Sequence, residues 1–183
     1  MSKIVVIDAG HGHYTPGKRC LDGTREWDLN SRIANILAEM LTESGYRVYR
    51  ADDISGSKDI SLSQRVKLSN DVNADLYISI HHNAGLNGKK GGGTVVYYYS
   101  NDTNRERQAK ALYHSVVNET RLVGNRAQKV IKKAFYVLRK TKAPAFLIEN
   151  GFMDSSTDMP IIKAEAHAER TAIGIYNFIL NEF

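Results

Sequence analysis

Short apolar runs, rich in β-branched residues, alternate along the chain with longer segments whose apolar residues recur at helical spacing. The short runs predict strands at residues 3–8, 46–50, 76–80, 94–100 and 145–149, with a further short strand near 135–138. The helical spacing predicts helices at 27–44, from Ser61 onward, around 109–117 and at 168–179. This alternation indicates one α/β domain over residues 1–183, with a twisted, mostly parallel sheet and helices on both faces.

Residues at the segment ends support these boundaries. Gly45 follows the first helical segment and is typical of a helix stop. Ser61 and Gln64 have the spacing of a capping box, which predicts a helix N-terminus at that point. A glycine-rich turn at residues 91–93 leads into the strand predicted at 94–100.

The composition is that of a globular domain. The chain has 183 residues, of which 42% are hydrophobic and 25% are charged. No run approaches about 18 consecutive apolar residues, so no membrane span is expected. The N-terminus enters the first predicted strand almost at once, and we expect no signal peptide and synthesis in the cytoplasm.

Charge and cysteine content narrow the chemistry. The net charge is +5, and basic residues cluster at 129–142, which favours nucleic acid, an anionic membrane or an acidic cell wall as partners, or solubility alone. Cys20 is the single cysteine, which excludes an intramolecular disulfide and a thiolate-rich zinc site. It lies in a polar loop with no base beside it in the sequence, so we expect no nucleophilic role.

Polar side chains follow three of the predicted strands. His11 and His13 come after the first strand, His81 and His82 after the strand at 76–80, and Glu149 ends the strand at 145–149. The carboxyl ends of parallel strands meet at one edge of a sheet, so we expect these groups to gather there. Glu26 begins the first helical segment, close in sequence to the first of these loops.

Two imidazoles and a carboxylate are the protein ligands of a catalytic zinc site, in which the fourth position stays open. Such a metal lowers the pKa of water and polarises a carbonyl, and Glu149 has the chemistry of the carboxylate that would move the protons. Two alternatives remain open from the residues alone. Glu149 can be a surface residue at a strand end, and Glu26 can be an acidic residue favoured by a helix dipole.

Several separated motifs resemble one family. They are "IVVIDAGHG", "NADLYISIHHNA", "NRAQK" and "VLRKTKAPAFLIENGFMDSSTD", with a Glu 15 positions after His11. In order and character they are similar to the zinc-dependent N-acetylmuramoyl-L-alanine amidase family of the amidase-3 type, from about Lys3 through the last helix. The resemblance implies hydrolysis of the amide between the lactyl group of N-acetylmuramic acid and the L-alanine of the stem peptide.

The resemblance also implies roles for individual residues. The zinc ligands fall on His11, Glu26 and His81, and the catalytic Glu falls on Glu149. The Asn of the second motif falls on Asn83, near the substrate. Neighbouring strand residues point to opposite faces, so His82 is expected beside the cleft or behind the ligands. His13, His114 and His167 are expected to have no part in the chemistry. The family's Asn-Arg-Gly segment reads "NRA" at 125–127, and no role is assigned to it.

The implied partner is bacterial peptidoglycan, with an affinity for anionic wall polymers and none for nucleic acid. A monomer is expected, acting on the cell wall in the manner of a phage endolysin or after release by another route. Two rival functions are a zinc peptidase of stem peptides and a non-catalytic wall-binding module of the same fold.

Overall fold

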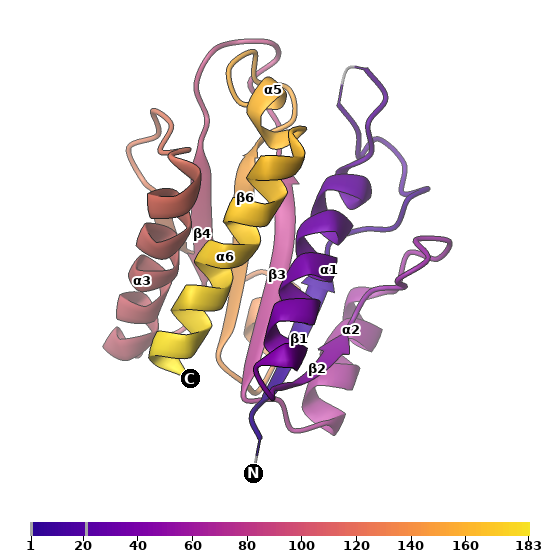
Figure 1. Cartoon of the computed structure of the whole chain (residues 1–183), viewed down its shortest axis with the longest axis vertical. Helices are drawn as coiled ribbons and strands as arrows, with labels where there is room; N and C mark the ends of the chain where they lie inside the picture. The colour runs from indigo at the N-terminus through magenta and orange to yellow at the C-terminus, as the bar shows by residue number, and fades with distance from the viewer. Residues whose placement is uncertain (1, 21) are drawn as a thin grey trace.

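A computed structural model describes residues 2–20 and 22–183 and has the expected α/β architecture (Figure 1). Its sheet has six strands in the order β2-β1-β3-β6-β4-β5. All neighbouring pairs are parallel except β4 and β6, which are antiparallel. The strands are β1 (Ile4–Ala9), β2 (Arg47–Arg50), β3 (Leu76–Asn83), β4 (Thr94–Tyr98), β5 (Val130–Lys132) and β6 (Ala145–Phe152).

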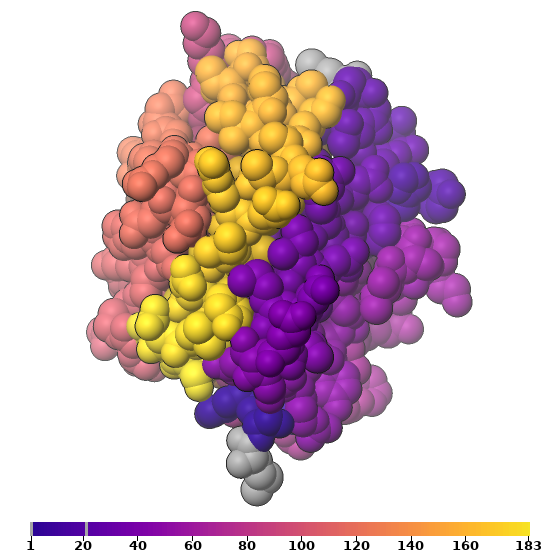
Figure 2. Space-filling view, in the orientation of Figure 1, coloured from indigo at the N-terminus to yellow at the C-terminus, as the bar shows by residue number. Residues whose placement is uncertain are grey.

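Helices cover both faces of this sheet, as expected. Helices α1, α3 and α6 lie side by side on one face, where Figure 2 shows α6 between the other two. Helices α2 and α4, which are shorter, cover the opposite face. Within the described residues, no helix combines the length and apolarity needed to cross a membrane. The helices are α1 (Glu26–Glu43), α2 (Leu62–Asp71), α3 (Thr103–Thr120), α4 (Tyr136–Lys140), α5 (Met159–Ile162) and α6 (Glu165–Glu182).

The central strands are apolar on both faces because both faces are covered. In β1, Val5 and Ile7 join the core under α1, α3 and α6, whereas Val6 joins the core under α2 and α4. Strand β4 divides in the same way: Tyr98 packs in the first core and Tyr97 in the second. The predicted boundaries are also confirmed at α2, where Ser61 and Gln64 form the expected capping box.

The predicted strand at 135–138 is wrong. Phe135 has an extended backbone and caps α4, and Val137 and Leu138 are buried beneath this helical turn. Four consecutive apolar or aromatic residues have neither a strand nor a helix period, so the pattern could not decide between the two. The edge strand β5 lies earlier, inside the segment interpreted from sequence as a basic cluster.

Cys20 is also placed differently from the expectation of a polar loop. Its side chain is buried against Leu29, Leu122, Met153 and Ile162 in a small apolar cluster. Burial raises the pKa of the Cys20 thiol to about 11, which keeps it in the unreactive thiol form. Arg19 and Asp22 of the same loop are exposed, whereas Cys20 lies in a cluster with Leu29 of α1.

Candidate active site

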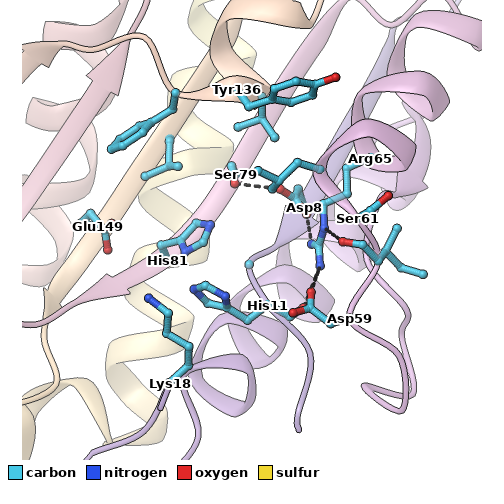
Figure 3. A pocket seen from close by; sticks show the side chains of 16 residues that line it. Asp8, His11, Lys18, Asp59, Ser61, Arg65, Ser79, His81, Tyr136 and Glu149 are labelled. Carbon is cyan, nitrogen blue, oxygen red and sulfur yellow. Dashed lines mark hydrogen bonds and ion pairs between the residues drawn. The ribbon is translucent and has the colours of Figure 1, made fainter. Parts of the chain in front are cut away.

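The carboxyl ends of β1, β3 and β6 are neighbours in the sheet and carry the predicted site residues (Figure 3). His81 and Glu149 are direct partners in the β3–β6 register, so their side chains leave the same face side by side. His11 follows β1 in the next loop. These groups lie on the face of α2 and α4, where two short helices leave the strand ends uncovered.

His11, Glu26 and His81 converge on one point. The two carboxylate oxygens of Glu26 lie 3.2 Å from Nε2 of His11 and 3.0 Å from Nδ1 of His81. One donor atom from each of the three residues lies within 4.8 Å of the others. The two imidazole rings meet edge to face, with centroids 4.9 Å apart. Two nitrogens and a carboxylate at these separations fit the donor set of a divalent cation such as zinc.

The loop after β1 has the shape that this convergence needs. His11 has a positive φ of 68°, a left-handed conformation that turns its side chain back toward the sheet edge. Gly10 lies against the His81 ring: a Cβ at this position would be 2.1 Å from Cε1 of His81. A side chain at Gly10 would therefore displace the imidazole from its place beside Glu26.

Charge is balanced within the triad. Burial disfavours ionisation of Glu26, but hydrogen bonds and charge from His11 and His81 hold its pKa well below the usual value. Burial lowers the pKa of His81, but the hydrogen bond and charge of Glu26 outweigh it and raise that pKa. The carboxylate is thus ionised, and its two oxygens are committed to the two rings.

Glu149 has the opposite character. Burial raises the pKa of Glu149 to about 7; His81 opposes the shift, Glu26 adds to it and Lys18 opposes it. Its Oε2 is buried and has no hydrogen-bond partner among the described residues. A carboxyl group that titrates near neutrality and has a free oxygen can accept and return a proton.

A buried ion pair that the sequence analysis missed supports the site from behind. Arg65 of α2 pairs with Asp8 of β1, and Tyr77 and Ser79 donate hydrogen bonds of 2.7 and 2.8 Å to the same carboxylate. Arg65 also donates to the carbonyl of His11, at 2.9 Å. The pair therefore connects α2, β1 and the loop that carries His11. Asp8 belongs to a quoted motif, but no pattern pointed to Arg65.

Two cavities flank the triad. The larger, about 620 Å³, reaches toward α2 and α4 and has an apolar wall that includes Leu62, Phe135 and Tyr136. The smaller, about 400 Å³, is lined by the 16–19 loop and the end of β3. Both share His11, Lys18, His81 and Glu149. The site is thus a groove with the converging groups at its middle. Lys18, like Arg65, was missed by the sequence analysis.

The other two predicted site residues, His82 and Asn83, lie beside the groove. His82 points to the opposite face from His81, as expected, and its Nδ1 lies 2.8 Å from Oδ1 of Asn30. Burial lowers the pKa of His82 to about 3, so the ring is neutral. Its backbone N–H donates to Glu26 at 3.2 Å, which places His82 behind the group formed by His11, Glu26 and His81. Asn83 lines the smaller cavity.

The other histidines stay apart from the converging groups. His13 hydrogen-bonds Asp28 at 2.8 Å. His114 is exposed on α3. His167 lies in the first turn of α6, which begins earlier than predicted, and is buried 6.5 Å from the His82 ring between centroids.

Comparisons with known proteins identify the family to which the chain belongs. The family model described as N-acetylmuramoyl-L-alanine amidase matches residues 5–181. The chain is 30% identical to the N-acetylmuramoyl-L-alanine amidase CwlM of Bacillus licheniformis, over 98% of this chain and 68% of that protein. It is 32% identical to the endolysin of Bacillus phage SPP1, over 94% of this chain and 66% of that protein. The chain thus spans about two thirds of the length of these relatives.

Solved structures give the same answer for the fold. The N-acetylmuramoyl-L-alanine amidase from Clostridium difficile 630 superposes with a TM-score of 0.88 at 30% identity, covering 98% of this chain and 96% of that one. The amidase AmiC2 of Nostoc punctiforme gives 0.87 at 30% identity, with the same coverage. The chain is therefore a member of the N-acetylmuramoyl-L-alanine amidase family.

Proposed function

We propose that this chain is a zinc-dependent amidase of the cell wall, in which His11, Glu26 and His81 hold the metal and Glu149 transfers protons. The reaction is hydrolysis of the amide that joins the lactyl group of N-acetylmuramic acid to the L-alanine of the stem peptide. The proposal rests on one observation above all: Glu149 lies beside His81 with an unpaired buried oxygen, next to three converging donor groups.

Zinc, when bound, polarises the scissile carbonyl and lowers the pKa of water toward neutrality. Glu149 accepts a proton from the attacking water as the new carbon–oxygen bond forms. It then gives that proton to the nitrogen of L-alanine as the carbon–nitrogen bond breaks. Burial raises the pKa of Glu149, which favours holding the proton until it passes to the leaving nitrogen.

The residues around these four have supporting roles in the proposal. The His82 N–H and the ring of His11 hold the Glu26 carboxylate in place. Asn83 is placed to contact substrate from the smaller cavity. The basic surface is proposed to retain the protein, acting as a monomer, on anionic wall polymers.

The experiment combines metal analysis with product analysis. We expect roughly one zinc per chain, loss of peptidoglycan hydrolysis on chelation and recovery on adding zinc back. The products should be stem peptides with a new N-terminal L-alanine. Shorter peptides would instead favour the stem-peptide peptidase, and wall binding without any cleavage would favour the non-catalytic module.

The role of Glu149 is tested by Glu149→Gln. This variant should retain zinc and wall binding but lose at least about 100-fold in turnover, because the amide cannot accept the proton. Glu169→Gln, on the exposed face of α6, changes the net charge equally and should keep full activity. Turnover by Glu149→Gln close to the wild-type rate would refute the assignment.

A further inference from the structure

Lys18 occupies a position in the groove that the proposed chemistry does not use. It lines both cavities, together with three of the four residues proposed for metal binding and proton transfer. Figure 3 shows its side chain extending toward the side on which Glu149, His11 and His81 lie. The carbonyl of Lys18 accepts a 2.9 Å hydrogen bond from the backbone N–H of Glu26, which ties this loop to the ligand helix.

The Lys18 ammonium group is available to a ligand. Across residues 2–20 and 22–183, the structure records no hydrogen bond or ion pair for the side chains of Lys18 and its neighbour Arg19. Glu26, the ionised carboxylate of the site, has both oxygens engaged by His11 and His81. An unpaired cation in a substrate groove attracts an anionic group of the substrate.

The two halves of the substrate differ in charge. The sugar side of the scissile amide carries hydroxyl and acetamide groups and no anion near the bond. On the peptide side, the residue after L-alanine is D-glutamate, whose α-carboxylate is free in some walls and amidated in others. A cation beside the scissile bond therefore favours the peptide side.

The two cavities also differ in charge. The smaller one contains both Lys18 and Arg19. Among the described residues that line the larger cavity, Lys18 is the only Lys or Arg without a partner, because Arg65 is paired with Asp8. The outer wall of the larger cavity is apolar at Leu62, Phe135 and Tyr136. An uncharged sugar fits the apolar wall better than an acidic peptide does.

From this arrangement we propose that Lys18 binds the α-carboxylate of the second stem-peptide residue, with the peptide in the smaller cavity and the sugar in the larger one. This inference rests on the proposed function and deepens it. Lys18 is a specificity-determining residue: it distinguishes walls with a free carboxylate at this position from walls with the amide.

The test uses paired muropeptides that are identical except for D-glutamate or D-isoglutamine at the second position. Wild-type protein should have a lower KM for the acidic form, and Lys18→Met should raise that KM by roughly two- to fivefold, the range of one exposed ion pair. The KM for the amidated form should not change, and any change in kcat should be the same for both forms, because it comes from the loss of the Lys18 charge near Glu149. Lys18→Arg should restore the preference.

Two control variants isolate the effect. Lys110→Met removes one positive charge on α3, away from both cavities, and should leave the preference unchanged. Tyr136→Ala alters the wall of the larger cavity and should raise the KM for the acidic and the amidated muropeptide equally.

Equal KM values of wild-type protein for the acidic and the amidated muropeptide would overturn the inference. So would an unchanged ratio of the two KM values in Lys18→Met, because that pattern means that Lys18 does not contact the carboxylate that distinguishes the two forms. Failure to cleave either form would refute the proposed function instead. Calorimetric binding of the two muropeptides to Glu149→Gln, and to the same variant carrying Lys18→Met, then decides the inference without turnover.

Discussion

Gly10 and His81 show how much of the site depends on single residues. The His81 ring occupies the space that a Cβ on residue 10 would take, and this contact sets the distance from the ring to Glu26. His11, one residue later, adopts a left-handed conformation that brings its Nε2 to the other oxygen of Glu26. Two adjacent backbone positions thus place both imidazoles.

Gly10→Ala should weaken zinc binding by about 10- to 100-fold, the range seen when groups that orient metal ligands are altered. The physical reason is displacement of the His81 ring, because a Cβ cannot sit 2.1 Å from Cε1. Competition with a chromogenic chelator measures the change.

The control for this prediction is Gly45→Ala. Gly45 has a φ of +84°, and an added Cβ would meet no atom within 4 Å, so this variant should lose about 1 kcal/mol of stability through backbone strain and keep its zinc affinity. Equal zinc affinity in Gly10→Ala and wild-type protein would mean that the loop can relax around the new methyl group.

At the scale of elements, the Asp8–Arg65 pair links α2 to the sheet and to the ligand loop. Arg65 donates to the carbonyl oxygens of Ile60, Ala9 and His11 as well as to Asp8. Burial opposes ionisation of Asp8, but the charge of Arg65 and a hydrogen bond from Tyr77 lower its pKa. The pair therefore stays ionised and keeps the end of β1 against α2.

Arg65→Met should destabilise the fold by about 3–5 kcal/mol, because it leaves the buried Asp8 carboxylate without its counter-charge. The double variant Asp8→Asn/Arg65→Met should recover a large part of that loss. Urea unfolding of wild type, both single variants and the double variant gives the coupling energy. A loss below about 1 kcal/mol in Arg65→Met would show that the pair is dispensable.

His167, in the first turn of α6, is a buried titratable group that lies outside the groove. Burial lowers the pKa of His167 to about 4, below the ordinary value of 6.5 for histidine, so its neutral form is favoured in the folded state. The unfolded chain binds this proton more readily, so the stabilisation is complete above pH 6.5 and decreases as the pH falls toward 4.

His167→Gln removes this titration. Between pH 7 and pH 4.5, wild-type protein should lose about 2 kcal/mol more stability than the variant. Chemical denaturation at the two pH values measures the difference. Parallel losses in both proteins would show that His167 keeps an ordinary pKa and that other groups, including His82, govern the acid limit.

At the scale of the whole molecule, positive charge is unevenly distributed. The segment from Arg121 to Ile148 contains no Asp or Glu, and it supplies β5, α4 and the Phe135–Val137 wall of the larger cavity. This basic segment thus adjoins the larger cavity at Phe135–Val137. Its basic side chains are Arg121, Arg126, Lys129, Lys132, Lys133, Arg139, Lys140 and Lys142.

Retention on intact cell wall should therefore fall steeply between about 0.05 and 0.5 M salt, as exposed charges become screened. Replacing Lys132, Lys133, Arg139 and Lys140 with Gln should remove most of this salt dependence while hydrolysis of small soluble muropeptides is unchanged. Co-sedimentation with purified walls, with and without their anionic polymers, measures retention. Salt-independent retention by wild-type protein would exclude the proposed role of these basic side chains in wall binding.

Elements whose form depends on neighbouring residues in the sequence are predicted better than elements whose form depends on packing. Strand and helix positions are predicted well where a continuous apolar, β-branched run or a period of 3.6 is clear, as in β1, β3 and α1. The alternation of side chains along a strand also predicted correctly that His81 and His82 face opposite ways. The segment at 135–138 has no period, and its helical form depends on packing against the sheet.

The sequence by itself determined the family, the class of fold and the kinds of donor group at the strand ends, because motif order and residue chemistry are written along the chain. Tertiary structure decided what depends on distance between segments far apart in sequence. It selected Nε2 of His11 and Nδ1 of His81 as the donors beside Glu26. It paired Arg65 with Asp8 and placed Lys18 in the groove. No pattern of neighbours encodes these choices, since each arises where the parallel sheet brings separate strand ends and loops together.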